Sequence, residues 1–497
     1  MENKENKKIN VNLQNLKEIR QIDPRLASYN IEMAEVTGGT FWKPYSLEQL
    51  AGKADFSNFK GLQDMSSMME YFPPIDLYTP RLRKLARDLG PAWIRVSGSW
   101  ATKTYFDVDG HTNGRAPEGY DSVLTVDEWK GVLDFVKAVD GKLLISVTNC
   151  DGNHTVNEPW NPDQAKALFD FSKNYGVPIA AAEFMNEPNM LSFSGAPQGY
   201  PEKDFARDQD LFFNFIKENY PETLTVGPSS MIRDQLGNAV NLLPVPFLNP
   251  RDLMKGTKVA PDVLSYHCYN GISQRMASIG GGWTADQALK PVYLNIPKNC
   301  ALEFASLRDQ YCPGAPMWVT ESADAGGGGS VWASTYLDIF RTLIALGSFA
   351  KVTDGVIFHN PLASSDYGLL DHRTFAPRPN YFAFLLWNRF MGTTVYATDS
   401  LKDDDYVFIH YRRDGKRGLT YLVLNPSRDK TLSLDLPGDA EEYRLSADSM
   451  ISPVMKVNGM PLQLTDDDQL PEIHPVFRKK GEVTLEPLTA AFFVMEF

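Results

Sequence analysis

The sequence predicts a (β/α)₈ barrel followed by a C-terminal antiparallel β-sandwich. From about residue 79 to residue 360, short apolar runs alternate with amphipathic stretches, and after about residue 393 the pattern changes to period-two alternation broken by turn signals. The length of 497 residues leaves room for a barrel and a second domain. We expect residues 1–20 to add a strand to the sandwich, residues 21–392 to form the barrel and residues 393–497 to form the sandwich.

Eight short apolar runs are the candidate barrel strands. Continuous apolar runs of this length are typical of parallel strands that are buried on both faces. The stretches between several of them have the apolar period of a helix, as a barrel requires. The expected strands are 26–33, 92–96, 143–147, 179–184, 225–227, 263–266, 318–320 and 355–358, and the expected helices include 80–89, 126–139, 162–175 and 332–346.

The C-terminal part alternates polar and apolar residues, which is typical of strands with one buried face. The turn dipeptides Asp414-Gly415, Pro437-Gly438 and Asn458-Gly459 separate several of these segments. The opening segment, Ile9 to Leu16, alternates in the same way, so it is the strand expected to join the sandwich from the N-terminus. The expected sandwich strands are 406–411, 420–424, 431–436, 443–445, 454–457, 483–485 and 491–496.

Composition argues against several classes of partner. A net charge of -13 disfavours nucleic acid, anionic membranes and heavily sulfated polymers. No apolar run approaches the roughly 18 residues of a membrane span, and the first residues lack the apolar core of a signal peptide, so cytoplasmic, periplasmic and secreted locations all stay open. The four cysteines lack C-x-x-C spacing, which disfavours a zinc or redox site; Cys300 and Cys312 could pair only in an exported protein, and buried free thiols are expected.

Two carboxylate motifs stand where an apolar strand ends. Asn186-Glu187-Pro188 follows the fourth expected strand, and Thr320-Glu321-Ser322 closes the seventh. In a barrel the carboxyl ends of all strands meet at one face, so the two glutamates can lie across a single pocket. Facing carboxylates are the groups that hydrolyse glycosidic bonds.

The two glutamates suit different steps of a retaining mechanism. Glu187 suits the acid/base and Glu321 the nucleophile, while Asn186 can reach the 2-hydroxyl of the sugar. His267 and Tyr269 are two residues apart on the sixth strand and share one face, so either could donate a hydrogen bond to Glu321. This chemistry requires no metal or cofactor.

These motifs resemble those of clan A glycoside hydrolases, and the chain is similar to glycoside hydrolase family 79, the family of heparanases and β-glucuronidases. The resemblance rests on Pro80 to Arg95, Glu183 to Asn189, Glu321 to Gly329 and Ala490 to Val494, and it spans nearly the whole chain. It implies a barrel with a sandwich, a retaining β-glucuronidase activity and, as substrate, an oligosaccharide or polysaccharide that bears β-linked glucuronate.

The resemblance also implies a pocket for the substrate carboxylate. Gly327, Gly328 and Tyr367 correspond to the residues that bind the uronate in this family, and glycines let backbone amides approach an anion closely. Glu32 corresponds to an acidic residue that binds sugar hydroxyls, although the nearby Glu35 is an alternative.

Departures from the animal heparanases favour weakly charged substrates over heparan sulfate. Animal heparanases carry a long excised linker between the second strand and its helix, whereas here only Asp107 to Ser122 fill that interval. Ser97-Gly98-Ser99-Trp100 stands where those enzymes have a Lys-containing segment. The segments Gly38 to Tyr78 and Ile272 to Lys298 are the expected pocket walls. Up to two of four tryptophans are expected to be sugar platforms, and the four are Trp42, Trp160, Trp283 and Trp332.

Two alternatives to a β-glucuronidase remain. One is a clan A hydrolase for a neutral β-glycoside, and the other is a catalytically silent glycan-binding protein.

Overall fold

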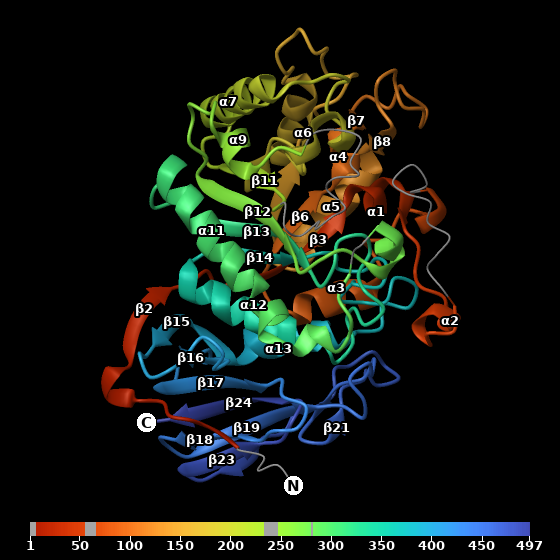
Figure 1. The fold of residues 1–497 in the computed structure, drawn as a ribbon. Helices are drawn as coiled ribbons and strands as arrows, with labels where there is room; N and C mark the ends of the chain where they lie inside the picture. Colours follow the sequence, from red (N-terminus) through yellow and green to blue (C-terminus); the bar gives the residue numbers. More distant parts are fainter. Residues whose placement is uncertain (1–5, 55–65, 233–246, 280–281) are drawn as a thin grey trace.

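The computed structural model describes residues 6–54, 66–232, 247–279 and 282–497. Figure 1 shows a helix-wrapped barrel above a stack of antiparallel sheets that the last hundred residues build. The fold class expected from the sequence is confirmed.

The barrel is a closed ring of eight parallel strands in the order β3-β6-β9-β10-β11-β12-β13-β14, and pairing of β14 with β3 closes it. The carboxyl ends of all eight strands therefore meet at one mouth. The strands are β3 (Ala27–Glu32), β6 (Trp93–Ser97), β9 (Lys142–Ser146), β10 (Ala181–Glu183), β11 (Leu224–Ser230), β12 (Val263–Tyr269), β13 (Met317–Ala323) and β14 (Val356–His359).

Local sequence signals explain where the barrel helices begin. Pro80 stands at the first position of α3, where its missing N–H costs nothing, and Thr125 and Glu128 form a reciprocal capping box at the start of α5. The helices are α1 (Met33–Thr37), α2 (Leu47–Leu50), α3 (Pro80–Asp88), α4 (Ser99–Thr102), α5 (Val126–Ala138), α6 (Asp163–Asn174), α7 (Glu202–Asn219), α9 (Pro250–Met254), α10 (Pro291–Leu294), α11 (Ile296–Tyr311), α12 (Asp338–Val352) and α13 (Pro379–Phe390), with short 3₁₀ turns η1 (Leu13–Asn15), η3 (Pro188–Ser194), η5 (Gln274–Ile279) and η6 (Gln287–Leu289).

Two short strand pairs interrupt the βα connections after β3 and β6. An antiparallel pair, β4 (Gly39–Trp42) with β5 (Met69–Phe72), follows the first barrel strand, and a parallel pair, β7 (Thr104–Asp107) with β8 (Ser122–Thr125), follows the second. Both pairs lie in connections that leave the carboxyl ends of the barrel strands, where loops often carry function.

The C-terminal domain consists of a nine-stranded sheet and a three-stranded sheet, and an apolar cluster packs between them. The N-terminal strands belong to these sheets, since β1 pairs in parallel with β18 and β2 pairs antiparallel with β15. The strands are β1 (Lys7–Ile9), β2 (Lys17–Gln21), β15 (Met391–Ala397), β16 (Val407–Arg412), β17 (Gly418–Asn425), β18 (Leu432–Leu436), β19 (Ala440–Ser446), β20 (Lys456–Val457), β21 (Met460–Pro461), β22 (Val476–Arg478), β23 (Gly481–Leu485) and β24 (Thr489–Glu496).

Barrel and sheets share one core. The ring of Phe390, at the end of α13, lies 4.2 Å from the ring of Tyr443 and 5.5 Å from that of Phe492. The hydroxyl of Tyr336 donates to the carbonyl oxygens of Leu445 and Leu488, at 2.9 Å each. The sheets therefore pack against α13 and the segment that leads into α12.

Two sequence expectations about elements are wrong. The strand expected over residues 9–16 is replaced by η1, because the Asn12 side chain accepts from the backbone N–H of Gln14 and turns the chain. The helix expected over 332–346 begins only at Asp338, since residues 331–337 form turns.

All four cysteines are free and buried. In the described part of the chain, no helix combines the length and the apolarity needed to cross a membrane.

Candidate active site

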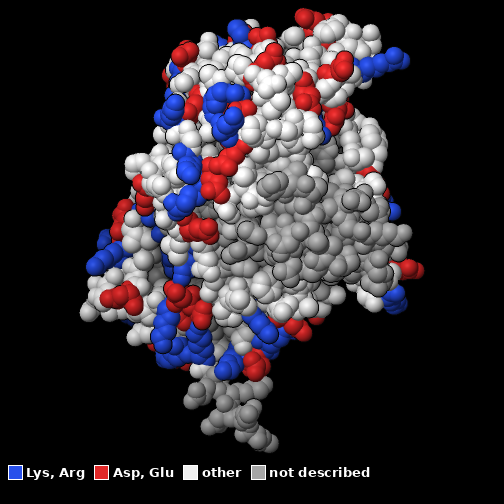
Figure 2. All heavy atoms as spheres, turned by 45° about the horizontal axis from the view of Figure 1, so that its top comes forward, with Lys and Arg blue, Asp and Glu red and all other residues white. Residues whose placement is uncertain are grey.

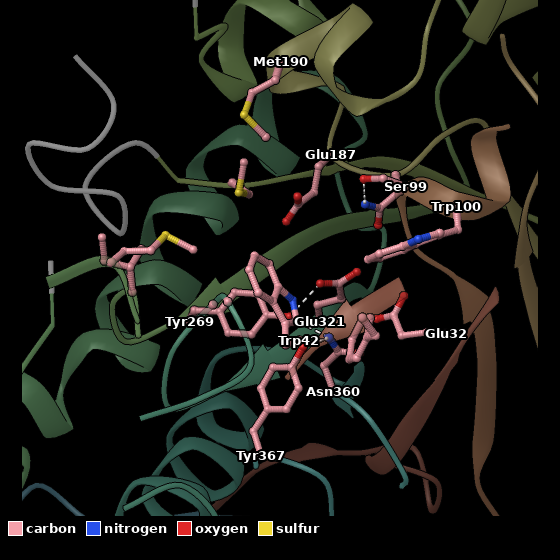
Figure 3. A pocket seen from close by; sticks show the side chains of 18 of the residues that line it. Glu32, Trp42, Ser99, Trp100, Glu187, Met190, Tyr269, Glu321, Asn360 and Tyr367 are labelled. Carbon is pink, nitrogen blue, oxygen red and sulfur yellow. Dashed lines mark hydrogen bonds between the residues drawn. The ribbon is translucent and has the colours of Figure 1, made fainter. Parts of the chain in front are cut away.

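A cavity of about 310 Å³ opens at the mouth of the barrel, at the carboxyl ends of its strands. Figure 3 shows Glu187 and Glu321 reaching into it from different elements, with aromatic rings beside them. Both expected wall segments contribute to its lining. The lining residues from these segments are Phe41, Trp42 and Met69 from the first and Ile272 and Met276 from the second.

Glu187 and Glu321 are neighbours across this cavity. One carboxylate oxygen of each, together with a ring nitrogen of His267, all lie within 4.8 Å of one another. Retaining glycosidases hold their two carboxyl groups about 5–5.5 Å apart, whereas inverting enzymes hold them about 6.5–9.5 Å apart to admit a water. The spacing fits a nucleophile and an acid/base acting on one bond.

The backbone of Glu187 is strained. Its φ of 45° and ψ of 57° put a non-glycine residue in the left-handed region, which costs on the order of 1 kcal/mol or more. The surrounding chain holds it there, because its N–H donates to the carbonyl of Ser229 and its carbonyl accepts from the hydroxyl of Ser194 at 2.6 Å. Backbone strain of this kind is concentrated at functional sites.

Glu321 lies at the end of β13 and accepts two strong hydrogen bonds. Arg95 Nη1 donates to one carboxylate oxygen at 2.9 Å, and the Tyr269 hydroxyl donates to the other at 2.7 Å. A donor on each oxygen fixes the orientation of the carboxyl group. Tyr269 thus has the contact with Glu321 that the sequence suggested for either Tyr269 or His267.

His267 contacts the other glutamate more closely. Its Nδ1 lies 2.9 Å from Glu187 Oε1 and 3.5 Å from Glu321 Oε2. Its Nε2 faces Arg95 Nη2 at 3.5 Å, and because guanidinium can only donate, Nε2 is the acceptor and Nδ1 carries the hydrogen. His267 therefore donates to Glu187 Oε1, which leaves the second oxygen of Glu187 for a substrate.

Below Glu187 and Glu321 lies a buried polar layer. Arg95, with no exposed surface, donates to Glu183 Oε1 through Nε at 3.0 Å and Nη2 at 2.6 Å. Burial alone would raise the pKa of Glu183, but Arg95 and the hydroxyls of Ser146 and Ser229 lower it below its usual range. Glu183 therefore stays charged and fixes the cation that contacts Glu321.

Asn186 joins this layer to the cavity. Its Oδ1 accepts from Arg95 Nη2 at 2.8 Å, and its Nδ2 donates to the hydroxyl of Ser99 at 3.3 Å. The amide is thereby oriented with its NH₂ group at the cavity wall, where a sugar hydroxyl could accept from it.

Glu32, Asn360 and Tyr367 form the closed end of the cavity. Asn360 Nδ2 donates to the hydroxyl of Tyr269 at 2.9 Å and to that of Tyr367 at 3.4 Å. Burial, and then the negative charge of Glu321, raise the pKa of Glu32 well above its usual range. Glu35 lies behind Glu32 and accepts from its backbone N–H at 2.7 Å, so of the two acids Glu32 is the one that reaches the cavity.

The glycine run after Glu321 lies along one wall. Gly327 and Gly328 have φ values of 81° and 86°, and a Cβ at these positions would lie 2.6 Å from Met276 Cε and 2.5 Å from Trp42 Cβ. Only glycine fits here. Gly327 lines the cavity, and among the described residues its N–H has no hydrogen-bond acceptor; Gly328 follows outside the lining. Arg275 Nη1 holds the carbonyl oxygens of Gly327 and Gly329.

The tryptophans divide into lining and packing residues. Trp42 and Trp100 line the cavity, and the ring of Trp100 lies 5.3 Å from that of Phe41. Trp160 and Trp332 are buried in the main core, and Trp283 donates to the carbonyl of Asn270. Trp100, rather than the expected lysine, thus stands beside the substrate space.

Among the residues that the structure describes, Glu187, His267 and Glu321 are the one group of three that could hold a metal ion. Arg95 and Tyr269 already donate to both oxygens of Glu321. A guanidinium so close to a would-be ligand opposes a cation, so the group suits proton transfer and nucleophilic attack better.

Arg95, Glu183 and Asn360 are the site residues that the sequence interpretation did not assign. Arg95 and Glu183 each stand inside an apolar run, and a charged residue in a buried strand needs a partner. That signal was present in the sequence, but it does not say which strand supplies the partner.

Similar sequences occur among heparanases and glucuronidases, whereas no protein-family model matches the chain. Heparanase-like protein 2 of Arabidopsis thaliana is 24% identical, with 85% of each chain covered. Hyaluronoglucuronidase of Hirudo nipponia is 24% identical over 85% of this chain and 90% of its own. Baicalin-β-D-glucuronidase of Scutellaria baicalensis is 24% identical over 72% and 66%.

Solved structures with the same fold are glycoside hydrolases. A 4-O-α-L-rhamnosyl-β-D-glucuronidase of Fusarium oxysporum superposes with a TM-score of 0.62 at 12% identity, covering 98% of this chain and 100% of its own. An α-L-arabinofuranosidase of Thermotoga petrophila gives a TM-score of 0.63 at 12% identity, covering 98% and 99%. In sequence, the chain is a relative of the heparanases and β-glucuronidases of glycoside hydrolase family 79, as its motifs predicted.

Proposed function

We propose that this protein is a retaining β-glucuronidase, in which Glu321 is the nucleophile and Glu187 the acid/base. The observation that carries the proposal is the pair itself: two carboxylates within 4.8 Å, one held by Arg95 and Tyr269 and the other by His267. Relatives named as a hyaluronoglucuronidase and a baicalin-β-D-glucuronidase support the sugar.

The reaction runs in two displacements. Glu321 attacks the anomeric carbon and the glycosidic C–O bond breaks, its electron pair going to the leaving oxygen, which takes the proton of Glu187. Water then attacks the same carbon as Glu187 removes its proton, and the bond to Glu321 breaks. Asn186 donates to the 2-hydroxyl of the sugar. Arg95 donates to one oxygen of Glu321, which is released from the sugar as a carboxylate in the second displacement.

The glucuronate carboxylate is bound by neutral donors. The N–H of Gly327 and the hydroxyl of Tyr367 lie at the cavity, with Gly328 supporting the turn. Burial raises the pKa of Tyr367 well above its usual range, so the phenol keeps its proton and donates. Because the pKa of Glu32 is raised too, Glu32 offers a carboxylic acid hydrogen rather than a repelling charge.

The closed end of the pocket favours a terminal glucuronate. Glu32, Phe41 and Tyr367 bound it, and none of them is more than 3% exposed. A further sugar beyond them would have to displace buried side chains. The substrate is thus a β-glucuronide whose sugar enters first.

A neutral β-glycosidase of the same clan and a silent glycan-binding protein remain the rivals. The test is hydrolysis of matched chromogenic β-glucuronide, β-glucoside and β-xyloside by the wild type and Glu321→Gln. We expect the glucuronide alone to be cleaved, with a loss of roughly 10⁵-fold or more in the variant, because the nucleophile is gone. Glu218→Gln, an exposed change on α7, is the matched control. Preference for a neutral sugar would refute the uronate pocket, and an active Glu321→Gln would refute the nucleophile.

A further inference from the structure

The leaving-group side of the cavity differs from its sugar side. In Figure 3, Met190 lies on the opposite side of Glu187 from Glu32, Asn360 and Tyr367. The acid/base must reach the glycosidic oxygen, so the sugar occupies the space between Glu187 and the polar end. The group attached to that oxygen then meets Met190 and its neighbours.

These neighbours are apolar. Met190, Phe193 and Met231 line the cavity here, whereas Ile272 and Met276 lie beside the glycine run on the sugar side. The acidic side chains in the described lining are Glu32, Glu187 and Glu321, and that lining includes no Lys or Arg. A sulfated or carboxylated sugar on the leaving side would therefore lose water without gaining a cation.

The described part of the face in Figure 2 is no better suited to a polyanion. On the coloured part of the face in Figure 2, basic side chains lie among acidic ones rather than along a track. The net charge of -13 adds a repulsive background.

Hydrogen bonds from a buried side chain hold the apolar wall in place. Asn189, fully buried, accepts from the backbone N–H of Met231 at 2.7 Å and donates to its carbonyl at 3.1 Å. Because Asn189 and Met190 are adjacent, this pair of bonds ties Met231 to Met190 just beyond Glu187. Phe193 keeps 38% of its surface exposed, so apolar area remains that a ligand could cover.

Methionine is suited to aromatic ligands. Its thioether is flexible and makes favourable contacts with ring edges, each contributing about 0.3–1.5 kcal/mol. Two methionines beside Phe193 can adapt to a flat ring system, whereas a sugar would need hydroxyl partners that Met190, Phe193 and Met231 do not offer.

We propose, resting on the β-glucuronidase function above, that the substrates are β-glucuronides of flat, apolar aromatic alcohols, with Met190, Phe193 and Met231 as the aglycone site. The aromatic alcohol leaves with the proton of Glu187, and glucuronate is released by water.

The test compares three β-glucuronides: 2-naphthyl, phenyl and a disaccharide with N-acetylglucosamine as the second sugar. Naphthol and phenol have similar acidity, so their kcat/KM ratio reports contacts of the second ring. We expect a naphthyl-to-phenyl ratio of about ten or more, by analogy with pocket discrimination between apolar groups, and slower cleavage of the disaccharide. Met190→Gln with Met231→Gln should bring the ratio near one.

Matched variants separate contact from folding. Met190→Leu keeps an apolar side chain and should keep the ratio, while Met460→Gln, 66% exposed on β21, should change nothing. The aglycone proposal alone fails if glucuronides are cleaved but the disaccharide is preferred. It also fails if Met190→Gln with Met231→Gln leaves the naphthyl-to-phenyl ratio of kcat/KM unchanged. Cleavage of no glucuronide at all would overturn the proposed function, and this proposal with it.

Discussion

The interior of the barrel mouth and the interior between the C-terminal sheets use opposite chemistry. At the mouth, the buried guanidinium of Arg95 forms ion pairs with both Glu183 and Glu321, so one cation balances two buried acids. Between the sheets, the cluster that includes Leu434 and Phe493 is aliphatic and aromatic throughout. The buried charges at the mouth therefore serve reactivity, whereas the apolar packing between the sheets supplies stability.

Among the variants that test this contrast, Glu187→Gln should have the largest effect on activity. It changes a residue at the mouth and leaves both buried charge partners of Arg95 in place. The variant should lose roughly 10³-fold in kcat/KM for phenyl β-glucuronide, because a poor leaving group needs the proton. A 4-nitrophenyl glucuronide should lose far less. Steady-state kinetics on both substrates decides, and equal losses would count against an acid role.

Arg95→Met should damage both stability and activity. It leaves Glu183 and Glu321 without their cation, at a cost of about 3–5 kcal/mol in the free energy of unfolding, with kcat/KM falling as well. Adding Glu183→Gln removes one of the two carboxylates left without a cation. The thermal stability of the double variant should recover in part, while activity should not, because Glu321 still lacks the hydrogen bond from Arg95. Recovery of activity would mean that Arg95 acts on the fold alone.

Leu434→Ala should do the reverse. Leu434 has no exposed surface and packs between the sheets on β18, so its truncation should cost about 2–5 kcal/mol. The kcat/KM of the folded enzyme at 25 °C should stay unchanged. Leu302→Ala, 51% exposed on α11, controls for the substitution itself. A change in the kcat/KM of Leu434→Ala without loss of folded protein would contradict the conclusion that packing between the sheets affects stability alone.

The smallest effect concerns acid stability of the sheet domain. Burial, aided by Lys351, lowers the pKa of His410 to about 4, so the folded state holds the ring neutral. The unfolded chain binds this proton near pH 6.5, and stability is therefore lost as the pH falls from about 6.5 to about 4, by up to roughly 3 kcal/mol. Unfolding midpoints of His410→Gln should depend less on pH over this window. The exposed His474→Gln should match the wild type, and a parallel shift in both would contradict the assignment.

The sequence predicted most of the scaffold because period and order are local. The eight barrel strands follow their apolar runs, and Glu187 and Glu321 end theirs. Arg95 escaped assignment because its meaning depends on β10 and β13, which are far away in the sequence. The wall of Met190, Phe193 and Met231 escaped because it is assembled from the loops after β10 and β11, whose paths no periodicity encodes.

The N-terminal pairing has a consequence for how the chain is made. Lys17–Gln21 and Lys7–Ile9 find their partners only in β15 and β18, which begin at Met391 and Leu432. During synthesis β1 and β2 leave the ribosome long before these partners, so their backbone groups stay unpaired until β15 and β18 have been made. The barrel can close when β14 meets β3, whereas the sheets form only from strands that the whole barrel sequence separates.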